Sequence, residues 1–254
     1  MKIHFALLVC MFPSISATQQ APSVVALLPR LYAYASEYRA KLPSLSCDES
    51  ITSQLVVDGK IKKETKIEAT LRELRDDSKT DPFIEHHTFN AVDGHPPKPH
   101  FKIPFLVQGG FANAVGFSRE DTAACFDYRL SSQGGGTTLR LDMALKANSS
   151  SNPHCNDILE GFKKTVLVDA DSGHITHVER TISAEAAKHA NEVYFASIDY
   201  APQKLGNDTF WLPARIYAHD PSGELRMFAV YSNFHRYTGE MKILPDEKLA
   251  DKSQ

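Results

Sequence analysis

The sequence predicts a mainly β (α+β) protein, built as a curved antiparallel sheet with two helices. Strand-like runs of apolar or alternating residues recur at short spacing through most of the chain. Turn sequences such as Asp58-Gly59 and Asp171-Ser172-Gly173 join consecutive runs. So many closely spaced strands with two helices favour an antiparallel sheet over parallel βαβ units.

Residues 1–17 have the three parts of a secretory signal peptide. Lys2 supplies a basic start, residues 5–12 are apolar, and small residues follow up to Ala17. The apolar run is shorter than the roughly 20 residues of a membrane-spanning helix. We therefore expect cleavage near Ala17 and a periplasmic or secreted protein. Lipid attachment at Cys10 and an uncleaved buried strand are the alternatives.

Composition narrows the classes of partner. The formal net charge is -3, and loss of Lys2 with the signal makes it about -4, which offers no basic face for nucleic acid. No later stretch is apolar enough to span a membrane, so we expect no integral membrane segment in the mature chain. Its length suits a single β domain over residues 18–245, monomeric by default, with residues 246–254 as a disordered tail.

Three cysteines remain once Cys10 has left with the signal: Cys47, Cys125 and Cys155. An odd number in an oxidising compartment predicts one bridge and one spare thiol. We expect the bridge between Cys125 and Cys155, because two strands and a hairpin-like turn lie between them. The alternative is that all three are small buried hydrophobes. Their spacing does not match the paired CxxC pattern of zinc sites.

The mature chain begins with an amphipathic helix over residues 23–41. Its apolar residues recur at three- and four-residue intervals: Val24, Leu27, Leu28, Leu31, Tyr34, Ala35 and Tyr38. Pro29 lies inside the pattern and predicts a kink or a separate first turn, and Pro43 ends it. We expect the apolar stripe to pack on the sheet.

Two strands follow on either side of Asp58-Gly59, over residues 51–57 and 61–74. The second strand carries charges that predict a solvated face: Lys62, Lys63, Glu64, Lys66, Glu68, Arg72 and Glu73. A third strand covers residues 83–92, and the prolines of residues 95–100 predict a surface loop. Residues 103–117 are apolar and rich in small residues, with a short helix expected at 110–115.

The rest of the chain reads as one strand after another. The expected strands cover residues 124–130, 137–147, 162–169, 174–180, 193–200, 210–219 and 225–237.

Several phrases of the C-terminal part resemble those of the LolA/LolB-like (periplasmic lipoprotein-carrier) superfamily. The phrases are Asp169-Ala170-Asp171-Ser172-Gly173-His174-Ile175, Val178-Glu179-Arg180, Tyr200-Ala201-Pro202, Trp211-Leu212-Pro213 and Tyr231-Ser232-Asn233-Phe234-His235-Arg236-Tyr237. The phrasing looks closest to uncharacterised exported acidobacterial proteins, which also share Leu42-Pro43-Ser44 and a cysteine such as Cys47. The resemblance is sharpest over residues 166–237.

The resemblance implies an open half-barrel with helices across its concave face and an apolar cavity able to hold acyl chains. A curved sheet of this size also has more apolar face than two helices can cover, so a ligand cleft is expected. We place five aromatic residues in that cleft: Phe105, Phe111, Trp211, Tyr231 and Phe234.

No motif predicts catalysis, a cofactor or a metal. The chain lacks a GxSxG elbow, an SxxK motif and a phosphate loop. His174 and His177 have an HxxH spacing, but residues three apart on a strand point to opposite faces, and the adjacent His86 and His87 diverge likewise. We therefore expect no catalytic residues and no metal site.

The sequence favours an exported, non-enzymatic binding or carrier-like protein whose apolar cleft accepts a lipid, an acyl chain or a lipidated partner. The first alternative is an envelope-associated structural or interaction protein that has no small ligand, its cleft filled by its own residues 83–117. The second alternative is a secreted hydrolase assembled from loop histidines and carboxylates.

Overall fold

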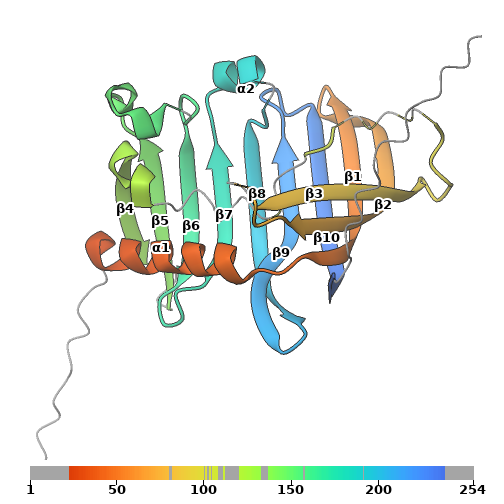
Figure 1. Ribbon diagram of the computed structural model, residues 1–254. Coiled ribbons are helices and arrows are strands. Elements are labelled where there is room, and N and C mark those ends of the chain that lie inside the picture. Colours follow the sequence, from red (N-terminus) through yellow and green to blue (C-terminus); the bar gives the residue numbers. More distant parts are fainter. Residues whose placement is uncertain are drawn as a thin grey trace, which may run out of the picture.

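A computed structural model describes residues 23–79, 82–99, 101, 103, 105–107, 111, 120–132, 137–156, 158–190 and 192–237. These residues form a ten-stranded sheet in the order β3-β2-β1-β10-β9-β8-β7-β6-β5-β4 (Figure 1). Every neighbouring pair is antiparallel, and β3 and β4 are the two open edges. The predicted fold, a mainly β protein with an open antiparallel sheet, is confirmed.

The first three strands form two successive hairpins. They are β1 (Leu45–Val57), β2 (Lys60–Arg75) and β3 (Phe83–Val92). Asp58 and Gly59 join β1 to β2 with φ of 51° and 72°. Two consecutive positive φ angles match the right-handed twist of the strands, which is why Asp-Gly predicts this turn correctly.

The other seven strands follow one another along the sheet. They are β4 (Phe126–Ser132), β5 (Thr138–Leu145), β6 (Lys163–Asp169), β7 (Ile175–Thr181), β8 (Phe195–Leu205), β9 (Asp208–His219) and β10 (Leu225–Arg236). The pairing of β10 with β1 joins this meander to the first three strands. The expected strand at residue 124 starts two residues later, because Glu120–Cys125 forms a 3-10 helix, η1.

Helix α1 (Val24–Lys41) lies across the strands near one end of the sheet (Figure 1). The Ser23 hydroxyl caps it by accepting a hydrogen bond from the Ala26 N–H at 3.2 Å. The helix is continuous through Pro29. Its buried residues share one face and pack into the core: Leu27, Leu31, Ala35 and Tyr38. The predicted amphipathic helix is thus confirmed.

A second helix, α2 (Ala184–Ala190), lies at the opposite end of the sheet (Figure 1). This helix was not predicted from the sequence. The signal was present, since the Ser183 hydroxyl accepts a hydrogen bond from the Ala186 N–H at 3.1 Å and helix-forming residues follow. The helix expected at 110–115 lies outside the described residues except for Phe111, as do the signal peptide and the tail.

A row of apolar side chains crosses the inner, concave face of the sheet and forms its core. The row joins partners on eight consecutive strands, from β5 to β2: Leu141, Val166, Val178, Ile198, Ile216, Ala229, Ile51 and Ile67. All of them are buried. Among the described residues, no helix has the length and apolar character needed to cross a bilayer.

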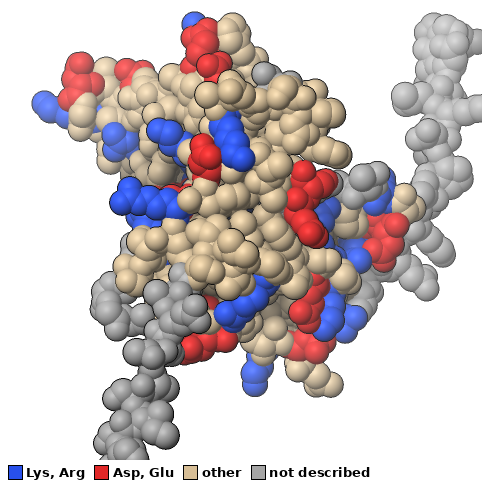
Figure 2. Space-filling model, turned by 90° about the vertical axis from the view of Figure 1, so that its left-hand side faces the viewer, with Lys and Arg blue, Asp and Glu red and all other residues tan. Residues whose placement is uncertain are grey.

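The surface that carries the β4 edge has mixed charge. Basic and acidic side chains are interspersed over it (Figure 2). The close neighbours of opposite sign include Arg140 and Asp142, whose side chains approach to 2.9 Å.

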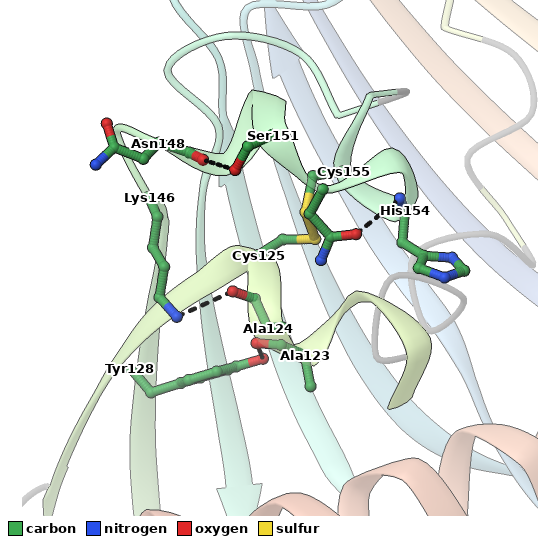
Figure 3. Close-up of a disulfide and its surroundings, with 10 residues drawn as sticks. Ala123, Ala124, Cys125, Tyr128, Lys146, Asn148, Ser151, His154 and Cys155 are labelled. Atoms are coloured by element: carbon green, nitrogen blue, oxygen red, sulfur yellow. Dashed lines mark hydrogen bonds between the residues drawn. A yellow bond between two sulfur atoms is a disulfide. The ribbon is translucent and has the colours of Figure 1, made fainter.

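A disulfide joins Cys125 to Cys155, as the sequence predicts (Figure 3). It links η1 to a second 3-10 turn, η3 (Pro153–Cys155), and both cysteines are buried. The Lys146 ammonium also donates to the Ala124 carbonyl at 2.9 Å (Figure 3). The bridge therefore ties the start of β4 to the loop after β5. Cys47 is the remaining described cysteine and carries a free, buried thiol.

We expect the double substitution Cys125→Ala and Cys155→Ala to lower the free energy of unfolding by about 3 kcal/mol, because the bridge closes a loop in the unfolded chain. Urea denaturation followed by circular dichroism measures this. Cys47→Ala, which removes a thiol without opening a loop, is the control. A double variant no less stable than Cys47→Ala would contradict the prediction.

Candidate functional site

The described residues of segment 101–111, which are 101, 103, 105–107 and 111, cover the β1 and β10 part of the concave face. The Phe105 N–H donates to the Ser53 hydroxyl at 2.9 Å, and that hydroxyl donates back to the Phe105 carbonyl at 2.8 Å. Ser53 is fully buried, and these two hydrogen bonds to the Phe105 backbone satisfy its hydroxyl. The Val107 N–H points at the Met227 sulfur, 3.3 Å away. The segment is therefore bonded to the floor of the sheet.

Three of the five predicted cleft residues come together where Phe111 of this segment meets β10. Phe111 is 1% exposed and packs edge-on against Tyr231, with ring centroids 5.2 Å apart. Phe234 completes the cluster, 6.2 Å from Phe111. The position of Phe111 differs from that expected for a cleft wall, because its ring fills the space between the other two.

A buried Glu-His-Glu cluster is also bonded to this segment, through the backbone of Phe111. His87 of β3 lies between two carboxylates: its Nδ1 is 2.6 Å from Glu49 on β1, and its Nε2 is 2.7 Å from Glu85. Glu85 also accepts a hydrogen bond from the Phe111 N–H at 3.1 Å. The side chains of His87 and Glu49 are 4% and 2% exposed. The cluster thus connects two strands to the covering segment.

The two carboxylates keep His87 protonated. Burial by itself lowers the pKa of the imidazole, but the hydrogen bonds to Glu49 and Glu85 outweigh it and raise the pKa from 6.5 to about 9. Both ring nitrogens then donate to carboxylates. His87 has no nitrogen left to accept a proton from a nucleophile, so this cluster is a structural ion pair and not a general base.

A groove of about 920 Å³ remains open at the α2 end of the concave face. One wall is the covering segment, and the other is formed by α2 and the β9–β10 turn. The apolar lining includes Ile103, Phe105, Leu106, Ala187, Val193 and Leu225. Charged side chains join the lining from α2 and from the turn: Glu185, Lys188, Glu192 and Asp220. Phe105 is the predicted cleft residue that lines this groove.

Trp211, the fifth predicted cleft residue, lies apart from the others. Its indole stacks on the His174 ring at 5.2 Å, and His174 meets Tyr34 of α1 edge-on at 5.7 Å. The stack packs at the boundary between the sheet and α1. The predicted cleft residues therefore lie at three places on the concave side, because strand position and not residue type determines which rings meet.

A polar group lies beneath α1 among the apolar side chains. The hydroxyls of Tyr34, Tyr38 and Tyr200 are buried there, together with the Glu73 carboxylate. Burial raises the pKa of Tyr34 to about 12 and that of Tyr38 well above its ordinary value, and the Tyr200, Tyr34 and Glu73 groups add to the rise at Tyr38. Because Tyr200, Tyr34 and Glu73 all act on the pKa of Tyr38, these side chains lie close to one another.

Glu73 corrects one expectation of the sequence analysis. It was placed with the charges of a solvated strand face, but it is 1% exposed. The reason is strand parity: Ile67, Ala69 and Leu71 are buried on β2, and Glu73 continues the same alternation. Its neighbour Arg72 is on the other face.

The HxxH pair does not converge on one point. His174 packs on Trp211, whereas the His177 ring bonds Asp199 at 2.6 Å and Glu179 at 3.2 Å. Within the described part of the chain, no three His, Cys, Asp or Glu side chains are arranged to hold a metal ion.

The Glu49–His87–Glu85 cluster is the feature that sequence reasoning missed. Its signal lies in β3, where Phe83, Glu85, His87 and Phe89 alternate with more exposed residues and so share the inner face. Two ionisable residues on an inner face need a partner. That partner, Glu49, lies two strands away in the sheet and is not recognisable from local spacing.

No family model and no curated protein matches the chain. Solved structures with a similar fold include a DUF1329 family protein from Desulfovibrio piger, with a TM-score of 0.48, 11% identity and coverage of 85% of this chain and 94% of that one. A putative outer membrane lipoprotein-sorting protein domain from Vibrio parahaemolyticus has a TM-score of 0.47, 8% identity and coverage of 84% and 93%. A LolA superfamily protein from Nitrosomonas europaea has a TM-score of 0.39, 11% identity and coverage of 84% and 94%.

The last two structures carry the names of the lipoprotein-sorting and LolA groups that the C-terminal phrases resemble. The closeness to acidobacterial proteins stays a prediction.

We expect the His87 cluster to stabilise the fold by an amount on the order of 3 kcal/mol. The folded pKa is raised, so this contribution is fully present below pH 6.5 and is lost as the pH rises through about 9. Urea denaturation at a series of pH values should show that loss in the wild type and not in His87→Gln. His86→Gln, which changes the exposed neighbour, should keep the wild-type profile. Identical profiles for wild type and His87→Gln would contradict the assignment.

Proposed function

We propose that this protein is an exported, non-enzymatic binding or carrier-like protein, and that it binds a lipid, an acyl chain or a lipidated partner in the groove at the α2 end of the concave face. The observation that carries the proposal is the groove itself. Its volume of about 920 Å³ lies within the range of ligand pockets. An apolar floor with a few charged groups among its lining suits a molecule with an apolar body and a polar end.

The walls of the groove favour an elongated apolar ligand. Val193 and Ala187 on one side are 9% and 2% exposed, and form a fixed surface at the base of α2. Leu106 and Phe105 on the other side are half-buried and held through Ser53. Covering the exposed parts of Leu106 and Phe105 with an acyl chain removes apolar surface from water, which is the main driving force for binding.

Export is supported by the pattern of residues 1–17 and by the disulfide. A bridge between Cys125 and Cys155 persists in an oxidising compartment such as the periplasm or the extracellular space. The free thiol of Cys47 fits the same setting because it is buried: burial raises its pKa, and the thiol form is unreactive.

The second candidate is an envelope-associated structural or interaction protein without a small ligand. The burial of Phe111 between Tyr231 and Phe234 favours it, because here the chain fills its own concave face. For the hydrolase alternative, the His87 cluster supplies no general base, since both ring nitrogens of His87 are bonded to carboxylates.

Protein purified from the periplasm should carry co-purifying acyl lipid, visible by native mass spectrometry and identified after extraction. A wild-type protein that gives only its own mass, and that takes up no lipid afterwards, would contradict the proposal.

Leu106→Glu should weaken acyl-lipid binding by more than tenfold, because an ionised carboxylate in the groove opposes entry of an apolar chain. Val230→Glu is the matched control: Val230 is 50% exposed on β10, and the same change there should leave binding unaltered. A fluorescent fatty-acyl probe in titration measures both. Equal loss in the two variants would argue against the groove.

Phe111→Ala separates the two candidates. Loss of a buried ring should lower the free energy of unfolding by about 3–5 kcal/mol, whereas Phe228→Ala, at a ring 42% exposed, should cost much less. Urea denaturation measures both. If segment 101–111 is the permanent filling of the concave face, lipid uptake is absent in the wild type and appears in Phe111→Ala. Uptake already present in the wild type would rule that candidate out.

A further inference from the structure

We propose that a hollow on the outer face of the sheet binds a neutral, β-linked glycan, one of whose sugar rings stacks on Phe195. The hollow has a volume of about 470 Å³ and extends over β4 to β8. Its lining residues Asp142, Thr165 and Glu179 are register partners, and each is next in sequence to a buried residue of the inner row. They therefore point to the opposite side of the sheet from the groove. The inference goes beyond the proposed function and does not depend on it.

The hollow exists because short side chains occupy the middle of this part of the outer face. Ala144, Thr165 and Thr181 lie there on three neighbouring strands, β5 to β7. Larger side chains stand at the two ends, Arg129 on β4 and Phe195 on β8. Strands lie about 4.8 Å apart, so β4 to β8 span roughly 19 Å. That length suits several linked sugar rings better than a single small molecule.

Phe195 turns one face of its ring to the hollow. His219, its register partner on β9, stacks on the ring at 5.1 Å with an interplanar angle of 20°. This contact covers the face toward β9. The other face is toward β7, where the register partner Thr181 lines the hollow. A pyranose ring with equatorial hydroxyls has apolar C–H faces, and packing one of them on an aromatic ring removes both surfaces from water.

The polar end of the hollow is held in place by internal hydrogen bonds. The Arg140 Nε donates to the Asp142 carboxylate at 2.9 Å, and the Thr165 hydroxyl donates to it at 2.7 Å. The hydrogen bond from Arg140 holds the pKa of the Asp142 carboxyl below its usual value, so this group stays ionised and accepts hydrogen bonds. The side chains of Arg140 and Asp142 are 38% and 36% exposed, so both are accessible to sugar hydroxyls.

The balance of charge in the hollow favours a neutral ligand. Its outer-face lining has three cations and three carboxylates: Arg129, Arg140, Lys163, Asp127, Asp142 and Glu179. The two other cations of the lining, Lys164 and Arg180, are register partners that alternate with these residues and belong to the inner face. An ionic ligand would lose its hydration without meeting a surplus of opposite charge. Sugar hydroxyls instead donate to the carboxylates and accept from the cations.

The test titrates the full-length mature protein with cellohexaose and chitohexaose, two neutral β-linked hexasaccharides, and with the acidic hexagalacturonate, by isothermal calorimetry. We expect at least one neutral hexasaccharide to bind and hexagalacturonate not to bind. Phe195→Ala should weaken binding by about tenfold, because the stacking surface is lost. Phe228→Ala is the matched control: it removes a ring from the same face of the sheet, outside the hollow, and should leave binding unchanged.

A second variant fills the hollow without removing a ring. Ala144→Gln places a longer side chain on its floor and should weaken binding at least as much as Phe195→Ala, with the circular dichroism spectrum of the wild type retained. Absence of binding of both neutral hexasaccharides would overturn the proposal. Wild-type affinity in Phe195→Ala and Ala144→Gln would overturn it as well. Tighter binding of hexagalacturonate would assign the hollow to acidic ligands instead.

Discussion

The pairing of β1 with β10 is the contact on which the rest of the structure depends. It joins a unit of two hairpins to a meander of seven strands and so makes one sheet of ten. Without it, the inner row of apolar residues would end at Ala229 on one side and begin at Ile51 on the other. The covering segment lies over this seam, bonded to Ser53 of β1 and facing Met227 of β10. The seam is therefore both the structural junction and the floor of the candidate site.

Helix α1 and segment 101–111 both cover parts of the concave face, and they differ in chemistry. Helix α1 covers the meander side through an apolar stripe interrupted by phenol groups, and it is attached by hydrogen bonds from Arg30 to the Ala170 carbonyl and from Arg75 to the Leu42 carbonyl. Segment 101–111 covers the seam and is attached by its backbone, to Ser53 and to the carboxylate that His87 holds in place. The groove lies on the far side of the segment from that ion pair. A single sheet thus offers two distinct polar environments next to apolar surface.

Strand parity explains both what the sequence predicts and what it leaves out. Alternation and turn residues locate the strands, as at Asp58-Gly59, because they depend on neighbours in the chain. Cys125 and Cys155 could be paired because the two strands and the hairpin-like turn between them are recognisable in the sequence. The burial of Glu73 and the partner of His87 could not be predicted from the sequence, since both depend on which strands lie together. The grouping of Phe111 with Tyr231, and not with Trp211, has the same origin.

The β1–β10 seam also sets the order in which the chain can assemble. Ser50 lies opposite Val230, so the two partners are 180 positions apart in the sequence. Closing so long a loop costs entropy before any contact rewards it, and folds dominated by such distant pairs form slowly. The floor of the site cannot exist until the last strand has been synthesised. A chain that completes its sheet last remains unfolded for longest, which is compatible with the export proposed above.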